Sequence, residues 1–352
     1  MKAPIKTDAL VIGAGPVGLF QVFQLGLQGI SCHVVDSLPQ IGGQCMELYA
    51  DKPIYDIPGI PVCTGSELIA QLAQQIQPFG ASFHLEQLVT EMERLPDGRL
   101  KVSTSSGTVF SVRCVFIAAG VGAFLPRKLA VEGLQAFEGQ QVFHKLDGRL
   151  NLAEQHLLVA GDNDAALETA IQSAQLSEGQ PASITLMHRR DRFQASEDNI
   201  AALHDLCAQG RVRFVAAQPT ACIVSDGRLT GLEVLTAQGL TDTLPVDIVI
   251  ASLGLSPRLG PLADWGLALE RKQLPVQTDT FATHESGIFA VGDINTYPGK
   301  KKLLLSGFHE CALAAFGAMP IIFPEKKVFL QYTTTSPRLH QILGVETSPL
   351  NG

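Results

Sequence analysis

The feature that most constrains this chain is a strand, glycine turn, helix and strand pattern that occurs twice. The first copy runs from Ala9 to Asp36 and the second from His156 to Arg190. Each copy places a predicted helix between two short apolar segments, which is the pattern of a βαβ unit in a parallel sheet. The sequence therefore predicts an α/β protein with two Rossmann-like, three-layer dinucleotide-binding domains.

The two halves of the chain share one further plan. After each βαβ unit, segments in which apolar and polar residues alternate predict an antiparallel meander. A short apolar strand that ends at a glycine follows each meander. These two strands are expected at Val115–Ala119 and Ile248–Ser252. A last strand is expected at Ile288–Gly292 and a helix at Gly307–Gly317, and the Thr/Ser-rich segment near the C-terminus is expected to be extended or turn-like.

Charge and cysteine content exclude several classes of protein. The net charge of −8 argues against a nucleic-acid partner, because nucleic-acid-binding proteins carry a basic footprint. Seven cysteines without a CxxC pair indicate neither a zinc site nor a disulfide framework, so a reducing, cytoplasmic location is expected. The uncharged run between Asp8 and Asp36 is long enough for a membrane span, but Gln21, Gln24 and Gln28 recur at helical spacing, so no membrane span is expected.

The first glycine turn, GAGPVG from Gly13 to Gly18, matches GxGxxG between a strand and a helix. The first glycine permits the tight turn, Gly15 lets the backbone approach a pyrophosphate, and the third lets the helix pack on the strand. The helix N-terminus offers amides to the phosphates. Asp36 ends the second strand, where an acid can accept hydrogen bonds from a ribose.

The second turn, GDNDAA from Gly161 to Ala166, matches only if Asn163 replaces the middle glycine. Asparagine tolerates positive φ better than other non-glycine residues, so the turn is expected to survive. Asp162 would repel a pyrophosphate by about 1 to 4 kcal/mol at ~4 Å. Arg189 and Arg190 end the second strand and could bind a 2′-phosphate, which points to NADP, although a solvated basic corner is the alternative.

Gly292 and Asp293 follow the last predicted strand and precede the last predicted helix. In flavoproteins with two dinucleotide domains, an aspartate at this place accepts a hydrogen bond from a ribityl hydroxyl of the flavin. A purely structural Gly-Asp turn is the alternative.

Several longer motifs resemble one family over nearly the whole chain. They are, in order, LVIGAGPVG, SLPQIGGQCMELYADKPIYDIPG, IAAGVGAFLPRKL, HRRDRF, FAVGDINTYPGKKK and LSGFHE. The order and content resemble the thioredoxin-reductase-like ferredoxin/flavodoxin–NADP⁺ reductases. Thioredoxin reductases carry CxxCDG where this chain has FHKLDG, from Phe143 to Gly148. The resemblance therefore implies a pyridine nucleotide-disulfide reductase-like fold without the redox CxxC.

The resemblance also implies domains, cofactors and site residues. It implies an FAD-binding domain of residues 1–118 plus 248–324, an NADP-binding domain of residues 119–247 and a tail, residues 325–352, that caps the flavin in a homodimer. Tyr49 and Tyr332 are expected to stack on the two flavin faces as catalytic residues. The FAD-binding residues, from the turn motif and the resemblance together, are Gly13, Gly15, Pro16, Gly18, Asp36, Gly43, Gln44, Tyr49, Val89, Phe124, Asp293 and Thr334. Those expected for NADP(H) are Gly161, Asn163, Asp164, Arg189 and Arg190.

The function implied is electron transfer from NADPH through FAD to ferredoxin or flavodoxin. Lys300 to Lys302, supported by Lys326 and Lys327, are the candidate docking patch for an acidic carrier, although a solvated loop is the alternative. The family usually has GGGDSA at the second turn and an arginine where this chain has Gln194. These departures leave open a flavoprotein with altered or lost NADPH use, linked to ferredoxin, NADH or a quinone, or a non-enzymatic flavin-binding sensor.

Overall fold

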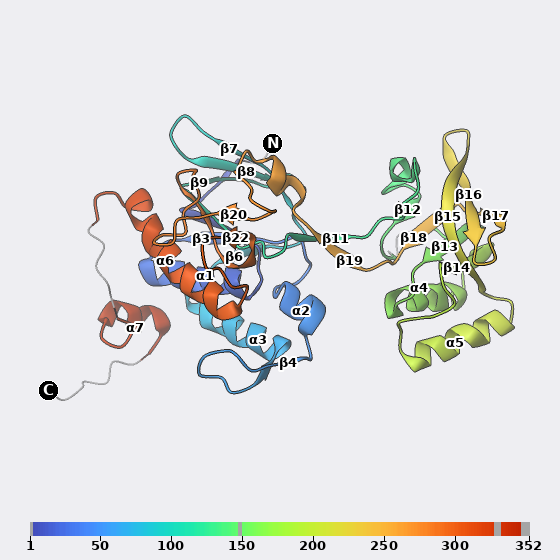
Figure 1. Ribbon diagram of the computed structural model, residues 1–352, viewed down its shortest axis with the longest axis horizontal. Coiled ribbons are helices and arrows are strands. Elements are labelled where there is room, and N and C mark those ends of the chain that lie inside the picture. Colours follow the sequence, from blue (N-terminus) through green and yellow to red (C-terminus); the bar gives the residue numbers. More distant parts are fainter. Residues whose placement is uncertain (1–2, 147–149, 327–331, 346–352) are drawn as a thin grey trace. The chain divides into compact units, whose positions relative to one another are not determined.

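The computed structural model describes residues 3–146, 150–326 and 332–345 (Figure 1). The chain forms two compact units: Met1–Phe124 with Pro257–Gly352, and Leu125–Ser256. These breaks lie six and nine residues after the expected boundaries. The second break is later because β18 (Ile248–Ala251) pairs within the sheet of the second unit. The two connections, β11 (Ala123–Pro126) and β19 (Leu255–Arg258), pair with each other.

The first unit is built on a parallel sheet of five strands. Their order is β21 (Ile288–Ala290), β10 (Cys114–Ile117), β2 (Ala9–Ile12), β3 (Cys32–Val35) and β6 (Ser82–His84). A second sheet has the order β1 (Ile5–Lys6), β9 (Val109–Val112), β8 (Leu100–Thr104) and β7 (Val89–Arg94). The helices are α1 (Pro16–Gln28), α2 (Gln44–Tyr49), α3 (Gly65–Ile76), α6 (Leu304–Ile322) and α7 (Pro337–Leu343).

Alternation along β2 explains the three layers of this unit. Ala9 and Val11 pack in a core with α1, α3 and α6, whereas Leu10 and Ile12 pack in another with β7, β8 and β9. All four β2 residues are buried, because both faces of a parallel sheet are covered. The uncharged run between Asp8 and Asp36 is thus β2, α1 and β3 of a folded core.

The second unit contains one sheet of seven strands. Their order is β12 (Val142–Phe143), β18, β13 (His156–Ala160), β14 (Ser183–His188), β15 (Arg213–Ser225), β16 (Arg228–Thr236) and β17 (Thr241–Pro245). Pairing is parallel from β12 to β15 and antiparallel from β15 to β17. The helices α4 (Asp164–Ala174) and α5 (Glu197–Ala208) share a core with Leu157 and Val159. The expected meander is present, with its first two segments joined in the bulged β15.

Short strands and 3₁₀ turns complete both units. The strands are β4 (Pro53–Ile54), β5 (Cys63–Thr64), β20 (Leu274–Pro275) and β22 (Asn295–Thr296). The 3₁₀ turns are η1 (Gln77–Phe79), η2 (Leu134–Phe137), η3 (Gly260–Asp264) and η4 (Gly292–Ile294).

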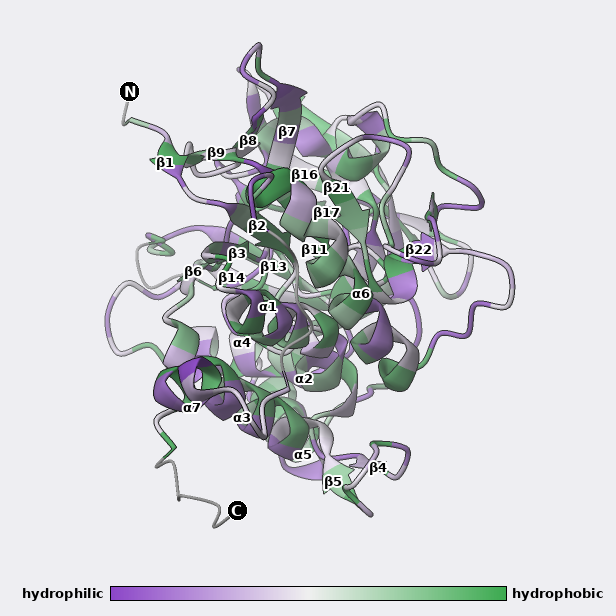
Figure 2. Cartoon of the chain, turned by 90° about the vertical axis from the view of Figure 1, so that its left-hand side faces the viewer, coloured by the Kyte–Doolittle hydropathy of each residue, from purple (hydrophilic) through white to green (hydrophobic). Residues whose placement is uncertain are grey.

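Helix α6 is longer than the sequence predicts and has an unusual composition. Judged by length and composition alone, it is the one helix among the described residues that could cross a membrane. It packs beside α1 (Figure 2), and its buried side chains include the carboxylate Glu310. The Glu310 carboxylate is fully hydrogen-bonded inside the unit, so α6 is a helix of the protein core.

The tail differs from the expected extended segment, because it contains α7. Ser336 caps this helix by accepting a hydrogen bond from Leu339 N, and Pro337 occupies its first position, where a missing N–H costs nothing. Gly344 ends the helix in the left-handed conformation. The sequence thus contains start and stop signals for a helix. The three threonines before Ser336 led to the expectation of an extended segment instead.

Candidate cofactor-binding site

The first unit holds a cavity of about 490 Å³ at the carboxyl ends of its parallel strands. Gly13 follows β2, Asp36 follows β3, Ala118 follows β10 and Gly292 follows β21, and all four line the cavity. This edge of an open α/β sheet is where such folds bind ligands. The expected FAD-binding residues that line it are Gly13, Gly15, Pro16, Asp36, Gly43, Gln44, Tyr49, Val89, Phe124 and Asp293.

The three glycines of the first turn have different surroundings. Gly13 has a φ of +107°, and a Cβ there would collide with Ala118 O. A Cβ at Gly18 would collide with Gly13 O, so both glycines are needed for packing of α1 on the strands. A Cβ at Gly15 would meet no atom within 4 Å. The space beside Gly15 is therefore open to a ligand.

Helix α1 begins at this open space without a side-chain cap. Gly15 is its N-cap residue and provides no side-chain hydrogen bond, and its first turn contains no acidic residue. The first amides of a helix have no partners within the helix, and they carry the positive end of its dipole. This end of α1 can therefore hold the two negative charges of a pyrophosphate.

The Asp36 carboxylate is positioned by two backbone amides. Oδ2 accepts a hydrogen bond from Ala14 N at 2.6 Å, and Oδ1 accepts one from Leu38 N at 2.8 Å. Burial raises the pKa of Asp36 above its ordinary value, and these amides oppose that rise. A carboxylate has about four acceptor sites, so lone pairs remain for two ribose hydroxyls.

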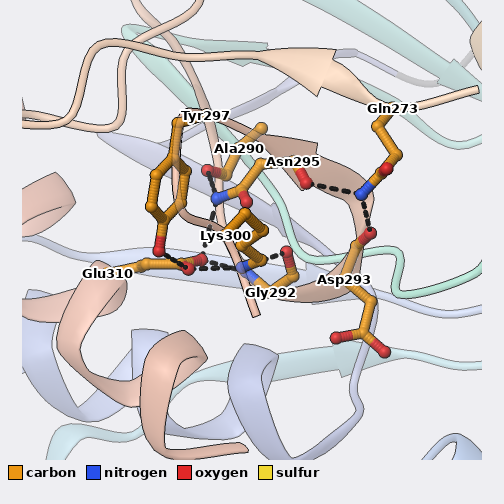
Figure 3. A network of polar contacts seen from close by, with 8 residues as sticks. All are labelled: Gln273, Ala290, Gly292, Asp293, Asn295, Tyr297, Lys300 and Glu310. Atoms are coloured by element: carbon orange, nitrogen blue, oxygen red, sulfur yellow. Dashed lines mark hydrogen bonds and ion pairs between the residues drawn. The ribbon is translucent and has the colours of Figure 1, made fainter. Parts of the chain in front are cut away.

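Asp293 is on the turn η4, and a buried polar network supports that turn (Figure 3). Glu310 of α6 and Lys300 form an ion pair there, and their side chains are 0% and 6% exposed. The expected docking patch from Lys300 to Lys302 is therefore wrong for Lys300, which is a core residue. Lys301 is exposed and Lys302 lines the cavity. Lys327 lies outside the described residues.

Tyr49 lies at the rim of the cavity, but Tyr332 and Thr334 do not line it. Tyr49 is 41% exposed, and Lys52 Nζ lies 5.3 Å from its ring centroid. Tyr332 is 64% exposed, and Thr334 is also exposed. The stacking of Tyr332 and the FAD contact of Thr334 stay predictions, since both were expected across a dimer.

The sequence interpretation gave no site role to Trp265, Leu262 or Glu310, among other residues. Trp265 and Leu262 line the cavity, and the indole Nε1 donates to Thr90 O at 3.3 Å. Glu310 had a usable signal, because it is the one charged residue between Leu304 and Ile322. A lone charge in so apolar a helix indicates a buried partner.

The second glycine turn has the same backbone course but different side chains. A Cβ at Gly161 would collide with Ser252 O, as a Cβ at Gly13 would with Ala118 O. Asn163 has a φ of −101°, so the expected positive φ is wrong. Its Oδ1 accepts a hydrogen bond from Ala166 N at 3.0 Å, and its Nδ2 donates to Ser252 O at 3.1 Å. Asn163 thus caps α4 and is tolerated because its backbone is extended.

The charges around this turn are arranged in two groups. Asp164 Oδ1 accepts hydrogen bonds from Ser196 and from Asn199 Nδ2, and these bonds lower the pKa of Asp164. Asp162 Oδ2 lies 3.5 Å from His188 Nε2, so an imidazolium there would offset its charge. Arg189 and Arg190 are exposed. Neither guanidinium bonds another described residue, so both are free to bind a phosphate.

The sequence lacks the CxxC pair that serves as a disulfide relay in thioredoxin reductases. All seven cysteines are free, and Phe143 begins the segment that aligns with CxxCDG. Asp147 and Gly148 of that segment lie outside the described residues. No group of three or more histidine, cysteine or acidic side chains among the described residues could hold a metal ion.

Comparison with known proteins places the chain among flavin- and nucleotide-dependent oxidoreductases. The family model "Pyridine nucleotide-disulphide oxidoreductase" matches residues 7–310. A ferredoxin–NADP reductase from Albidiferax ferrireducens is 57% identical over 344 residues, 98% of this chain and 97% of that protein. One from Polaromonas sp. is 54% identical over the same length, covering 98% of this chain and 94% of that protein.

Among solved structures, a thioredoxin reductase from Gloeobacter violaceus superimposes with a TM-score of 0.59 at 18% identity, covering 93% of this chain and 98% of that one. At that identity the likeness concerns the fold alone. It confirms the predicted fold class.

Proposed function

Because this chain belongs to the ferredoxin–NADP reductase family of pyridine nucleotide-disulphide oxidoreductases, as its motifs predicted, we propose that it transfers electrons between NADPH and ferredoxin through bound FAD. One observation carries the proposal. A single cavity brings together the uncapped N-terminus of α1, the Asp36 carboxylate and the Asp293 carboxylate. FAD, when bound, links the two-electron chemistry of a nicotinamide to one-electron transfer.

The residues of the first unit bind and orient the flavin nucleotide. The amides at the start of α1 hold its pyrophosphate, Asp36 accepts hydrogen bonds from its adenosine ribose, and Asp293 accepts one from its ribityl chain. Tyr49 covers one face of the ring system and excludes water from it. Gly15 supports this assignment, because its missing side chain leaves room against the backbone.

The second unit binds NADP(H). Gly161 permits the turn, Asn163 and Asp164 begin α4, and Arg189 and Arg190 bind the 2′-phosphate. Guanidinium groups suit this task because they donate pairs of parallel hydrogen bonds to phosphate oxygens. Both arginines are exposed and neither guanidinium has a partner among the described residues, which supports the assignment.

Because the sequence has no CxxC pair, we infer that electrons leave this protein from the flavin itself. We infer a small acidic carrier, ferredoxin or flavodoxin, that docks near the cavity rim where Lys301 and Lys302 lie. We also propose a homodimer in which Tyr332 and Thr334 lie against the flavin of the partner subunit, and a cytoplasmic location.

Anaerobic mixing of the purified yellow protein with NADPH, and separately with NADH, tests the proposal. We expect NADPH to bleach the flavin absorbance rapidly, and the reduced protein to support ferredoxin-dependent reduction of cytochrome c. FMN in place of FAD in the denatured supernatant, or flavin that NADPH does not reduce, would overturn it.

A second candidate is a flavoprotein reductase that uses NADH or a quinone. The side chain of Asn163 favours it, because that side chain occupies the position at which Gly15 of the first turn leaves open space. Equal bleaching by NADH and NADPH in the mixing experiment would support this candidate over the first.

A further inference from the structure

Glu310 is a fully buried carboxylate whose hydrogen bonds converge on one turn (Figure 3). Its Oε2 accepts from Gly292 N at 2.6 Å and from Asn295 Nδ2 at 2.8 Å. Its Oε1 accepts from Tyr297 OH at 2.9 Å and from Lys300 Nζ. The carboxylate thus has four donors, and all four belong to the segment that follows β21 and precedes α6.

Lys300 holds the other side of the same peptide group. Its Nζ donates to Gly292 O at 3.0 Å, as well as to Glu310. The N–H of Gly292 is therefore bound by the anion of the pair, and its C=O by the cation. Gly292 has a φ of +78°, which glycine adopts without strain, and the two bonds fix the orientation of its peptide group.

The uncharged side chain of Gln273 holds the next residues of the turn. Gln273 Nε2 donates to Asp293 O at 3.1 Å and to Asn295 O at 2.7 Å. The backbone on both sides of Asp293 is thereby held, while the Asp293 carboxylate points away from the network (Figure 3). That residue lines the cavity and makes no side-chain bond to another described residue.

Stability alone is a weak reason for such a pair, because the cost of desolvating two charges rivals their attraction. The geometry points instead to positioning. We propose that Glu310 and Lys300 are positioning residues that hold the Gly292–Asp293 turn against the flavin, and that their charges tune its reduction potential. This inference rests on the proposed function, since it takes the cavity as the FAD site.

The test compares Glu310→Gln, Lys300→Met and the double variant as holoenzymes at pH 8. Each single variant should release FAD more readily on dilution, with a dissociation constant raised about tenfold or more, as measured by recovery of flavin fluorescence. The midpoint potential should rise in Glu310→Gln, which leaves an unpaired cation behind the Gly292–Asp293 turn that lines the cavity. It should fall in Lys300→Met, and the double variant should return toward the wild-type potential.

Matched variants separate positioning from general loss of structure. Lys101→Met breaks an ion pair with Glu93 in the same unit, with 40% and 59% of those side chains exposed, and should change neither readout. Lys300→Arg should keep most of the affinity and the potential. Gln273→Leu removes an uncharged support, so it should weaken FAD binding without shifting the potential, and it serves if the charge variants do not fold.

Shifts of the same sign in the two single variants, or unchanged potentials in folded variants, would overturn the inference. Unchanged FAD release from folded Gln273→Leu would also overturn it. Wild-type protein that purifies without FAD would instead overturn the proposed function.

Discussion

In both units a glycine follows the first strand of the βαβ unit, β2 or β13, and lies against the backbone just after a neighbouring strand, Gly13 against Ala118 and Gly161 against Ser252. The units differ two residues later. Gly15 has no protein atom near the place of a Cβ, whereas Asn163 fills its place with an amide that caps α4 and bonds Ser252. The start of α1 has no capping side chain, whereas the start of α4 is capped by Asn163.

This difference separates two requirements that the glycine motif usually combines. The first glycine serves the fold, because any side chain there would strike the adjacent strand. The fold does not require glycine at the middle position, because the backbone there is extended in both turns and suits other residues. The last position also tolerates a small side chain, since the second turn has Ala166 where the first has Gly18.

The largest expected effect comes from making the first turn resemble the second. Gly15→Asn should reduce FAD affinity about 100-fold or more, because the new side chain enters the open space and competes for the amides of α1. The flavin-free variant should fold and melt near flavin-free wild-type protein, since asparagine is a favoured N-cap residue. Flavin content and thermal melting check both. Gly98→Asn, at an open turn of the same unit, is the control, and unchanged FAD content in Gly15→Asn would contradict the comparison.

The next largest effect concerns the end of the second strand of each βαβ unit. The first unit has Asp36 there, and the second unit has Arg189 and Arg190. Arg189→Ala with Arg190→Ala should raise the KM for NADPH about 10- to 100-fold, because a charge-assisted hydrogen bond contributes about 1.5 to 3 kcal/mol. The KM for NADH should change little. Arg213→Ala, at an exposed ion pair with Asp242, is the control in steady-state assays. Equal losses with both nucleotides would show that the arginines support the fold instead.

A smaller effect is expected when the second turn is made to resemble the first. Asn163→Gly should lower the KM for NADPH severalfold, because it frees the start of α4 for phosphate. It should also cost about 1 kcal/mol of stability, because one cap and one hydrogen bond are lost. Steady-state kinetics and thermal melting measure the two. Asn151→Gly, in an exposed loop of the same unit, controls for the added glycine, and an increased KM in Asn163→Gly would show that the amide itself binds the nucleotide.

The smallest effect concerns acid stability. Burial raises the pKa of Asp36 above 3.8 in flavin-free protein, so its contribution is complete below pH 3.8 and is lost as the pH rises through the raised value. Hydrogen bonds lower the pKa of Asp164 below 3.8, so its contribution is present above pH 3.8 and is lost as the pH falls. Denaturant unfolding of Asp36→Asn and Asp164→Asn against the wild type should therefore show pH dependences of opposite sign. Parallel pH profiles would refute this contrast.

The sequence by itself determined the layered architecture and most of the first site. Apolar segments of strand length, each followed by a glycine turn and a helix, specify parallel strands because local periodicity decides which face is buried. Strand ends meet at one edge of such a sheet, so Gly13, Asp36 and Asp293 had to converge on one cavity. Local signals of this kind are readable because their partners are a few residues away or fixed by the topology.

Tertiary structure decided which polar groups the chain itself satisfies. Three consecutive lysines indicate a solvated surface, yet Lys300 is buried because Glu310, on a different element, supplies the opposite charge. Asn163 likewise bonds Ser252, which lies 89 residues away just after β18. The sequence gives each polar side chain but not its distant partner. Burial of a charge is favourable only where packing brings that partner within bonding distance, so this choice depends on the complete fold.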